Sequence, residues 1–449
     1  MAIVNPAIAQ RATIGALAAT TVVIADMIGV GVFTSLGFQV VDITSGFSVL
    51  LLWLVGGVVA LCGALCYAEL AAMFPRSSGE YNFLSRSYHP ALGFMAGWLS
   101  ATVGFAAPVA LASMAFGHYA KSVVPDVPPL ALGLAIIWIV TLVHMRGVRD
   151  GSALQVSTTV LKLLLILAFI GAGFGLGTRQ PISFEPSAAD AAQIFSAPFA
   201  ISLVFVMYSY SGWNAATYII GEIRKPHSSL PLALLSGTLI VMVLYLALNA
   251  VFLYTTPLAA LAGRVDVAVA AGMFIFGERG SQVMGLIISL GLISSISAMT
   301  WIGPRVAMTM GEDFPILGVF ARRSANGTPR IAIICQAIIA SALFLTGSFE
   351  AVLEFIQFGL LCCSFLSVLG VIKLRLTRPD LPRPYRAWGY PVTPLIFLSV
   401  ITVTLYYLAV TRPLQSIAGF MVMLLGLVLY VLAASHAAHD SVKQVTIPK

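Results

Sequence analysis

The stretch Tyr208–Pro226, YSYSGWNAATYIIGEIRKP, places small and polar residues in the middle of an apolar segment. The preceding run Phe199–Met207 is expected to be helical, and apolar character returns at Ala215–Ile220. In hydrocarbon every backbone N–H and C=O group needs a partner, so an interrupted helix is tolerated only where it is buried or lines a cavity. The stretch therefore predicts either a kink that serves packing alone or a break whose free backbone groups bind a small polar solute.

The composition indicates an all-α polytopic membrane protein. The chain has 449 residues, of which 59% are hydrophobic and 9% charged, whereas soluble domains carry about 25% charged residues. The length allows about twelve spans. The net charge of +7 lies in short loops and reads as membrane topology, so no nucleic-acid partner is expected. The five cysteines lie in apolar segments without metal-ligand spacing, and we expect no cofactor, no metal and no catalytic set. The N-terminus lacks a signal-peptide pattern, so we expect no cleavage.

Twelve apolar windows are candidates for bilayer spans. Two of them are short and would need flanking residues to cross. With the tails, they divide the chain into 1–12, a first repeat 13–176, a second repeat 195–372, two further spans in 392–435, and a tail 436–449. The windows are Thr13–Leu36, Phe47–Phe74, Ala91–Tyr119, Leu130–His144, Ala153–Leu176, Phe195–Ile220, Leu230–Tyr254, Ser281–Met310, Ile331–Leu345, Val352–Ile372, Val392–Val410 and Ser416–Ser435.

Positive charges gather in every second loop. With twelve spans both termini lie on one side, and that side carries most of the arginines and lysines. By the positive-inside rule both termini are predicted to be cytoplasmic. The opposite side carries only Lys121, Arg179, Arg264, Arg279 and Arg412.

The first span carries a second break. Gly29, Gly31 and Gly37 interrupt it, and Asp26 precedes the interruption. Breaks in corresponding segments one and six are the sequence sign of an inverted-repeat transporter, in which spans 1–5 match spans 6–10 in opposite orientation. The repeat is inferred from the break positions alone, because the two halves share no visible sequence pattern.

Two charged residues lie inside spans. Lys162 shares a helix face with Gln155 and Thr158. It is a proton carrier, a permanent ammonium that occupies a cation site, or a lysine that snorkels to the interface. Asp26 is either a titratable or substrate-facing carboxylate or an acceptor within the scaffold.

Other polar residues carry weaker signals. Ser294, Ser297 and Thr300 form a hydroxyl stripe on span eight, which either faces the bundle core or only bonds between helices. We expect Glu69 to pair with a loop arginine. We expect Glu222 to form an inner latch with Arg224 and Lys225. Trp213 and Tyr208 suit either a gate over a bound solute or simple packing.

Several segments resemble the amino acid–polyamine–organocation (APC) superfamily, most closely its L-type amino-acid transporter group. MIGVGVF in span one resembles the superfamily's glycine break, and YAELAAMFPRSSGEY its loop after span two. YSGWNAATYIIGEIRKPHSSLPLALL in span six and LKLLLILAFI in span five resemble the L-type group, and GPRV with MTMGEDFP resembles its span-eight exit. The likeness covers about the first ten spans.

The resemblance implies a LeuT-like five-plus-five inverted repeat with two extra helices. It also implies sodium-independent exchange or proton-coupled uptake of amino acids by alternating access. By position, the N–H groups of Val30, Gly31 and Val32, beside Gly29, would hold the substrate carboxylate. The carbonyls of Ile28, Tyr208 and Ser211 would hold the amine. Lys162 would take the place of a sodium ion and tie span one to span eight, where Ser294 and Ser297 lie. Tyr208 matches a gating aromatic, and the signature of span six continues through Gly212, Trp213 and Asn214.

The sequence departs from the family pattern at three places. The break reads Gly-Val-Gly where relatives often have Gly-Ser-Gly, so backbone groups must bind the carboxylate without the hydroxyl. Asp26 stands where relatives often have Asn or Thr, which leaves open a permease for basic amino acids or polyamines, or a proton site. The loop Lys121–Pro128 has no cysteine, so no disulfide-linked heavy chain is expected. We predict a carrier in a cytoplasmic membrane, contacted by lipid and, if coupled, by protons. A channel or an intramembrane enzyme is the alternative class, without a polar ring or nucleophile to support it.

Overall fold

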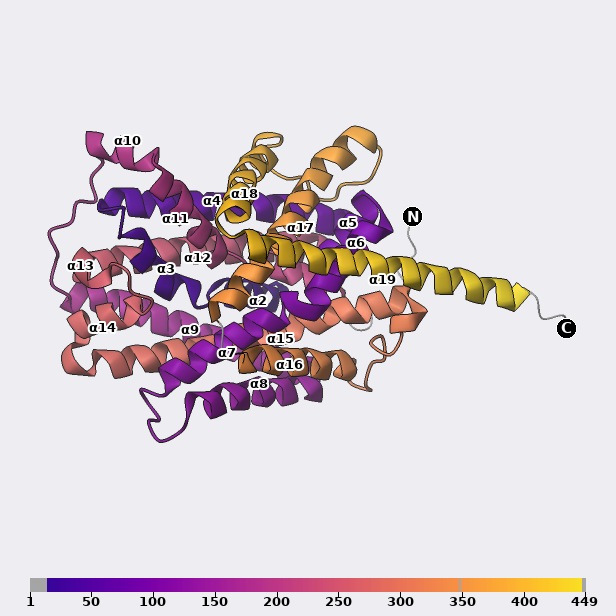
Figure 1. Cartoon of the computed structure of the whole chain (residues 1–449), viewed down its shortest axis with the longest axis horizontal. Helices are drawn as coiled ribbons and strands as arrows, with labels where there is room; N and C mark the ends of the chain where they lie inside the picture. Colours follow the sequence, from indigo (N-terminus) through magenta and orange to yellow (C-terminus); the bar gives the residue numbers. More distant parts are fainter. Residues whose placement is uncertain (1–13, 347–348, 446–449) are drawn as a thin grey trace.

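The computed structural model describes residues 14–346 and 349–445, which form a bundle of helices (Figure 1). In these residues the sole β-type contact is an isolated parallel bridge between Ile14 and Ile223. Ten helical segments are long and apolar enough to cross a membrane, or eleven if the pair Ala188–Ile194 and Ala197–Ser209, bent by 67°, is counted as one. The helix Arg330–Leu345 is apolar but shorter. The prediction of an all-helical, multi-pass protein is therefore confirmed.

The described helices follow the predicted windows closely, with boundaries shifted by a few residues at most ends. They are α2 Ala16–Met27, α3 Gly31–Gln39, α4 Gly46–Met73, α5 Glu80–Ser87, α6 Pro90–Leu99, the π segment η1 Ser100–Gly104, α7 Ala106–Ala120, α8 Pro129–Arg146, α9 Val148–Leu176, α10 Ala188–Ile194, α11 Ala197–Ser209, the 3₁₀ segment η2 Ala215–Glu222, α12 Pro226–Thr255, α13 Leu258–Leu261, α14 Val267–Phe276, η3 Gly277–Arg279, α15 Gly280–Asp313, η4 Pro315–Leu317, α16 Arg330–Leu345, α17 Phe349–Thr377, α18 Val392–Thr411 and α19 Pro413–Val445.

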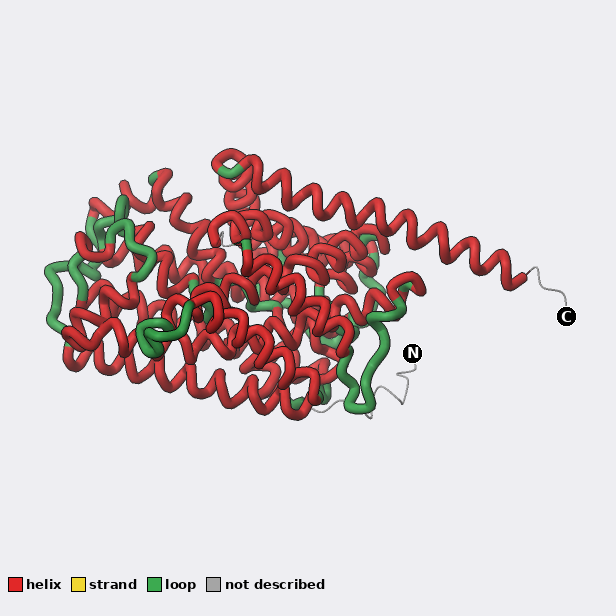
Figure 2. The backbone as a smooth tube through the Cα atoms, turned by 60° about the horizontal axis from the view of Figure 1, so that its bottom comes forward, coloured by secondary structure: helices red, strands yellow, loops and turns green. Residues whose placement is uncertain are grey.

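Local sequence accounts for several helix starts. Ser45 caps α4 by accepting a hydrogen bond from the N–H of Ser48. Proline in the first turn, where no helical N–H bond is lost, opens α8 and α12. Most loops lie at the two ends of the bundle, so the backbone between the ends is mainly helical (Figure 2).

The breaks lie inside the bundle. Helix α2 sits near the middle of Figure 1 and packs against α9, α12 and α15, while α11 packs against α3 and α4. The predicted span Ala91–Tyr119 contains a π segment, η1, between α6 and α7 that the sequence did not reveal. The π segment η1 interrupts the regular α-helix and packs against α15, α16 and α17.

Two loops and the C-terminal end of the chain complete the fold. The Ala/Val-rich part of the loop after span seven forms α13 and α14, which pack on α3, where the N–H of Gly263 donates to the carbonyl of Gly37 at 2.8 Å. The loop after span eight carries only the short η4. Helix α19 continues to Val445 and projects beyond the bundle, so it runs through most of the predicted tail 436–449 (Figure 1). The predicted tail 1–12 lies outside the described residues.

Candidate functional site

The first break separates α2 from α3. The N–H of Ile28 still bonds to Ile24, but the N–H of Gly29 turns back to Met27 at 2.9 Å. Helix α3 then begins at Gly31. As first-turn groups, the N–H groups of Gly31 and Val32 therefore have no acceptor within the helix. This break therefore presents the positive end of a half-helix to its surroundings.

The second break separates α11 from η2. Gly212 has φ +98°, a left-handed conformation that side-chain-bearing residues rarely adopt. A Cβ at Gly212 would lie 2.8 Å from both the carbonyl carbon and the carboxylate of Asp26. Glycine is thus required here twice, for its conformation and for the close approach of the two breaks.

Three side chains tie the broken helices together. The Tyr245 hydroxyl lies 2.6 Å from the carbonyl of Met27 and 2.9 Å from that of Ser209, so one group of α12 contacts the last turns of α2 and α11. The hydroxyls of Ser35 and Ser209 are 2.9 Å apart. Nothing in the sequence pointed to Tyr245, because a tyrosine in an apolar helix is usually a packing residue.

Lys162 is buried and faces the first break. Its ammonium donates to the carbonyls of Ala25 at 3.3 Å and Ile28 at 2.5 Å, and to the hydroxyl of Ser295 at 2.8 Å. The Ser295 hydroxyl itself donates to Ile28 at 2.8 Å. Lys162 therefore does not snorkel; it joins α2, α9 and α15 in the middle of the bundle.

The serines singled out on span eight lie elsewhere. Ser294 donates to the carbonyl of Gly291 in its own helix, and Ser297 lies 2.9 Å from Nε2 of His144. The hydroxyl partner of Lys162 is Ser295, one residue along. The rotation of α15 decides this, and a stripe at spacing three could not reveal it. On α9, the buried neighbour of Gln155 is Thr159 rather than Thr158.

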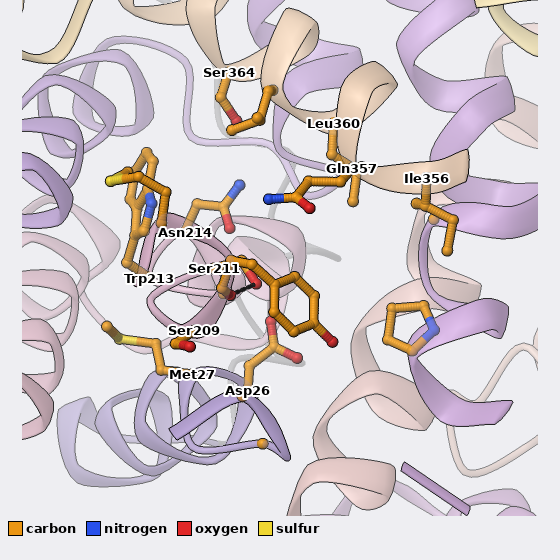
Figure 3. A pocket seen from close by; sticks show the side chains of 18 of the residues that line it. Asp26, Met27, Ser209, Ser211, Trp213, Asn214, Ile356, Gln357, Leu360 and Ser364 are labelled. Carbon is orange, nitrogen blue, oxygen red and sulfur yellow. Dashed lines mark hydrogen bonds between the residues drawn. The ribbon is translucent and has the colours of Figure 1, made fainter. Parts of the chain in front are cut away.

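The two breaks line one cavity of about 150 Å³ (Figure 3). The predicted site residues Asp26, Gly29, Val30, Gly31, Tyr208, Ser211, Gly212, Trp213 and Asn214 all contribute to its wall. Ile28 instead faces Lys162, and Val32 is buried in the core. The remaining wall is mostly apolar and comes from η1, α7, α17 and α18, with Phe105, Pro108, Leu111, Ile356 and Leu360 as examples.

Glu80 also reaches this cavity, although the sequence placed it in a polar loop where a carboxylate carries no signal. It accepts from the Tyr67 hydroxyl at 2.8 Å, from the Asn214 amide at 2.7 Å and from the Tyr218 hydroxyl. Trp213 stacks edge-on against Tyr67 with ring centres 4.7 Å apart. Glu80 therefore fixes the second break, and its oxygens are already engaged.

Two polar atoms of the cavity wall lack a hydrogen-bond partner within the described residues. In residues 14–346 and 349–445, Oδ1 of Asp26 and Nε2 of Gln357 are buried without a hydrogen-bond partner. They come from opposite sides of the cavity, α2 and α17 (Figure 3). Unsatisfied buried polar groups are costly and mark places where a ligand or water completes the bonding.

One end of the bundle is closed by ion pairs. Glu222 pairs with Arg305 at 2.8 Å and accepts from the Trp301 indole at 2.9 Å. Its predicted partners Arg224 and Lys225 were therefore wrong, because helix α15 brings Arg305 closer. Glu69 pairs with Arg375 at 2.6 Å, on α17, and with Arg383 in the following loop at 3.5 Å.

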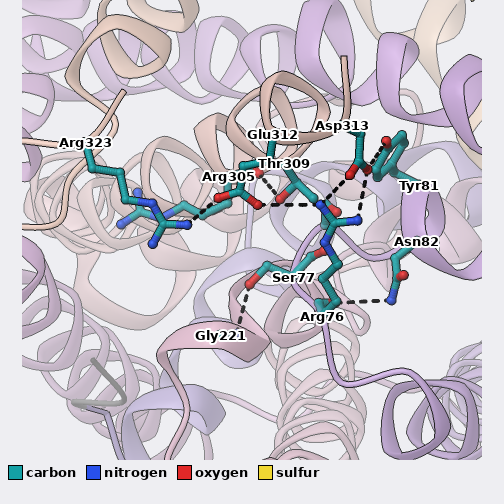
Figure 4. A network of polar contacts seen from close by, with 11 residues as sticks. Arg76, Ser77, Tyr81, Asn82, Gly221, Arg305, Thr309, Glu312, Asp313 and Arg323 are labelled. Atoms are coloured by element: carbon teal, nitrogen blue, oxygen red, sulfur yellow. Dashed lines mark hydrogen bonds and ion pairs between the residues drawn. The ribbon is translucent and has the colours of Figure 1, made fainter. Parts of the chain in front are cut away.

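A second network lies at the same end (Figure 4). Arg76 forms a two-bond pair with Asp313 at 2.8 and 2.9 Å, and Tyr81 donates to the same carboxylate. Burial and this hydrogen bond raise the pKa of Tyr81, which keeps its phenol protonated as a donor. Glu312, beside Asp313, pairs with Arg323. Together the pairs connect the loop after α4 to the end of α15.

Known proteins are similar to this chain over most of its length. Residues 14–434 match the model of a family described as amino acid permease. The chain belongs to this amino acid permease family, within the APC superfamily. The permease is 27% identical over 403 residues to the b(0,+)-type amino acid transporter 1 of Homo sapiens, with 87% of this chain and 81% of the relative covered. It is 25% identical to the Asc-type amino acid transporter 1 of Mus musculus, covering 95% and 82%. It is 28% identical to solute carrier family 7 member 13 of the same species, covering 92% and 88%.

The family makes this permease a transporter and not an enzyme. Within the described residues there is also no group of three or more His, Cys, Asp or Glu side chains that could hold a metal ion. All five cysteines are free thiols.

Proposed function

We propose that this permease is a secondary carrier that moves amino acids across a cytoplasmic membrane by alternating access. The observation that carries the proposal is the meeting of two helix breaks at one cavity that holds an unpartnered carboxylate oxygen. Broken helices near the bilayer midplane supply backbone groups to small charged substrates in transporters.

The substrate carboxylate is proposed to bind at the start of α3. The N–H groups of Val30, Gly31 and Val32 lie at the positive end of that half-helix. With valine at position 30, these N–H groups must bind the carboxylate without help from a hydroxyl.

The α-ammonium is proposed to bind Asp26. The carbonyl of Ile28 already accepts from Lys162 and Ser295, and that of Tyr208 already accepts from the N–H and hydroxyl of Ser211. Oδ1 of Asp26 is a buried acceptor on the cavity wall that has no partner among the described residues. Because every amino acid carries an α-ammonium, a carboxylate in this position does not require a basic side chain.

The wall opposite the breaks favours a neutral, largely apolar side chain. Phe105, Leu111 and Ile356 are among the residues that form it, and Gln357 adds one unpartnered amide donor. A basic amino acid or polyamine is the second candidate, with Asp26 as the ligand of its extra cation. Glu80 does not favour this candidate, because three side-chain donors already engage both of its oxygens.

We propose that transport is independent of sodium. The ammonium of Lys162 bridges the carbonyls of Ala25 and Ile28 to Ser295, where a cation would otherwise neutralise the same oxygens. Exchange and proton-coupled uptake remain two forms of the proposal. In exchange Lys162 is a fixed charge, whereas in coupled uptake Lys162 or Asp26 carries the proton.

The proposed topology has twelve spans in a LeuT-like arrangement. The ten long segments, the bent α10–α11 pair and the shorter α16 together give this number. Residues 13–176 and 195–372 would form the two inverted repeats, and residues 392–435 the two additional spans. The distribution of loop arginines supports a cytoplasmic position for both termini. The pairs Glu222–Arg305 and Arg76–Asp313 would then close the cytoplasmic side and open during transport.

Uptake by the purified permease in liposomes tests the proposal. The panel comprises labelled neutral, acidic and basic amino acids and a polyamine. Each is measured with and without internal substrate, an inward proton gradient and sodium. Uptake of neutral amino acids that is unaffected by sodium supports the proposal, and its dependence on internal substrate or on the gradient selects the form. Uptake of the polyamine or basic amino acids alone favours the second candidate, and no uptake of any panel member contradicts amino-acid transport.

A further inference from the structure

A second cavity, larger than the first, lies on the flank of the bundle. It has a volume of about 330 Å³ and is bounded by α6, η1, α15, the η4 region and α16. Representative wall residues are Trp98, Thr102, Pro304, Phe320, Cys335 and Ile338. The amino-acid site does not use any of them.

Helix irregularities create this cavity. The π segment η1 forms one wall, and Pro304, which lies inside α15, forms another. A π turn and a proline both depart from the regular i→i−4 hydrogen bonding of a helix. The space is thus built into the backbone and does not depend on one side-chain rotamer.

The wall offers little hydrogen-bonding capacity. The Thr102 hydroxyl donates to the carbonyl of Trp98 at 2.6 Å, and the Gln336 amide donates to that of Met299 at 3.0 Å. Among the described residues, the Trp98 indole nitrogen is buried without a hydrogen-bond partner, and the remaining wall residues are apolar apart from the thiol of Cys335. Ile338 is 54% exposed at the rim, on the surface that faces hydrocarbon in a multi-pass protein. The chemistry of the cavity fits a hydrocarbon chain that enters from the bilayer.

A positively charged residue lies close in sequence to the cavity wall. Arg322 follows the wall residue Phe320 by two positions and is exposed. The neighbouring Arg323 forms an ion pair with Glu312 at 2.5 Å. No ion pair of Arg322 is found in the described part of the chain. Arginine binds phosphate groups well, and a basic residue near a membrane surface attracts anionic lipids.

We propose that this cavity is a binding site for an anionic phospholipid. One acyl chain occupies the space between η1, α15 and α16, and the phosphate lies at Arg322. Pro304 in the wall precedes Arg305, which pairs with Glu222. A bound chain therefore supports the turn of α15 that carries this ion pair.

Native mass spectrometry of the purified full chain tests the proposal. The delipidated protein is titrated with phosphatidylglycerol or phosphatidylcholine of identical acyl chains. The wild type is expected to retain one phosphatidylglycerol with about fivefold preference over phosphatidylcholine. Ala307→Phe fills the cavity and should abolish retention of that lipid. Arg322→Gln should remove the preference, whereas Arg386→Gln, at an exposed arginine of another loop, should keep it.

A second measurement applies if Ala307→Phe does not fold. Ala332→Leu narrows the opposite wall, and phosphatidylglycerol with a diazirine on its acyl chain should label the α16 peptide that contains Cys335. Equal lipid retention by the wild type, the cavity variants and Arg322→Gln, or labelling confined to other helices, overturns the proposal. Neither readout requires transport, so the result is independent of the substrate assignment.

Discussion

The ammonium nitrogen of Lys162 lies 2.5 Å from the carbonyl oxygen of Ile28, the residue that follows the last residue of α2. Ser295 donates to the same oxygen from α15. One carbonyl released by the break thus receives donors from two other helices. The ammonium of Lys162 and the hydroxyl of Ser295 thus stabilise the first break. The groups proposed to bind the substrate are those that these two donors do not contact.

Lys162→Ala should lower the initial rate of amino-acid uptake by at least about tenfold. It removes a charged donor from two carbonyls that are buried in the bundle. Lys121→Ala, at an exposed loop lysine, is the matched control. Wild-type uptake by Lys162→Ala at every pH tested would remove the assigned role.

Ser295→Ala should slow uptake by about fivefold, the value of one neutral hydrogen bond of about 1 kcal/mol. Its hydroxyl bridges Lys162 and Ile28. Ser294→Ala is the control, because that hydroxyl bonds only to Gly291 in its own helix. Equal effects of the two substitutions on uptake would show that contact with the break does not matter.

Gly31→Ala should reduce substrate binding by about tenfold or more, and Gly31→Leu should abolish it. A Cβ at Gly31 would lie 2.7 Å from Oγ and 3.0 Å from Cα of Ser209, so α3 and α11 must move apart. Gly171→Ala, on α9 and outside this cavity, is the control, because a Cβ there meets no atom within 4 Å and substrate binding should be unchanged. Equilibrium binding of labelled substrate checks the pair, and unchanged affinity in Gly31→Leu would contradict the site.

Asp26→Asn should raise the KM for a neutral amino acid by about tenfold, because an ammonium–carboxylate contact becomes a neutral one. The substitution preserves shape beside Gly212, where space is limited. Asp42→Asn, at an exposed aspartate, controls for a general loss of charge. If Asp26→Asn transports neutral amino acids normally and no longer transports cationic ones, Asp26 binds the side chain of the substrate and not its α-ammonium.

Arg305→Gln should destabilise the permease by about 3 kcal/mol, because it leaves Glu222 without its buried partner. Size-exclusion chromatography of heated samples measures the Tm, which should fall clearly. Arg323→Gln breaks an exposed pair and should cost about 0.5 kcal/mol or less. The double variant Glu222→Gln/Arg305→Gln should recover part of the Tm, and no recovery would argue against the pairing.

The sequence was sufficient for features that depend on local chemistry. Glycines at 29 and 31, and Ser-Gly at 211–212, broke the apolar pattern at the points where the helices end. Lys162 was expected inside the bundle because a charge in hydrocarbon needs partners, and the structure supplies three.

Features set by helix rotation and by distant pairs were not predictable. Ser295 rather than Ser294 contacts Lys162 because of the rotation of α15, which a hydroxyl pattern does not specify. Arg305 displaces the expected partners of Glu222 because packing joins residues far apart in sequence. Glu80 gave no signal, since carboxylates are common in loops, and its role depends on Tyr67, Asn214 and Tyr218.

The central claim is that substrate binds between the two broken helices. Photolabelling with a diazirine analogue of the transported amino acid, followed by peptide mapping, tests it most directly. The account predicts labels in the Met27–Gly31 and Met207–Asn214 segments and in α17 near Gln357, all removed by excess unlabelled substrate. Competed labelling confined to helices outside this cavity, in protein that still transports, would contradict it.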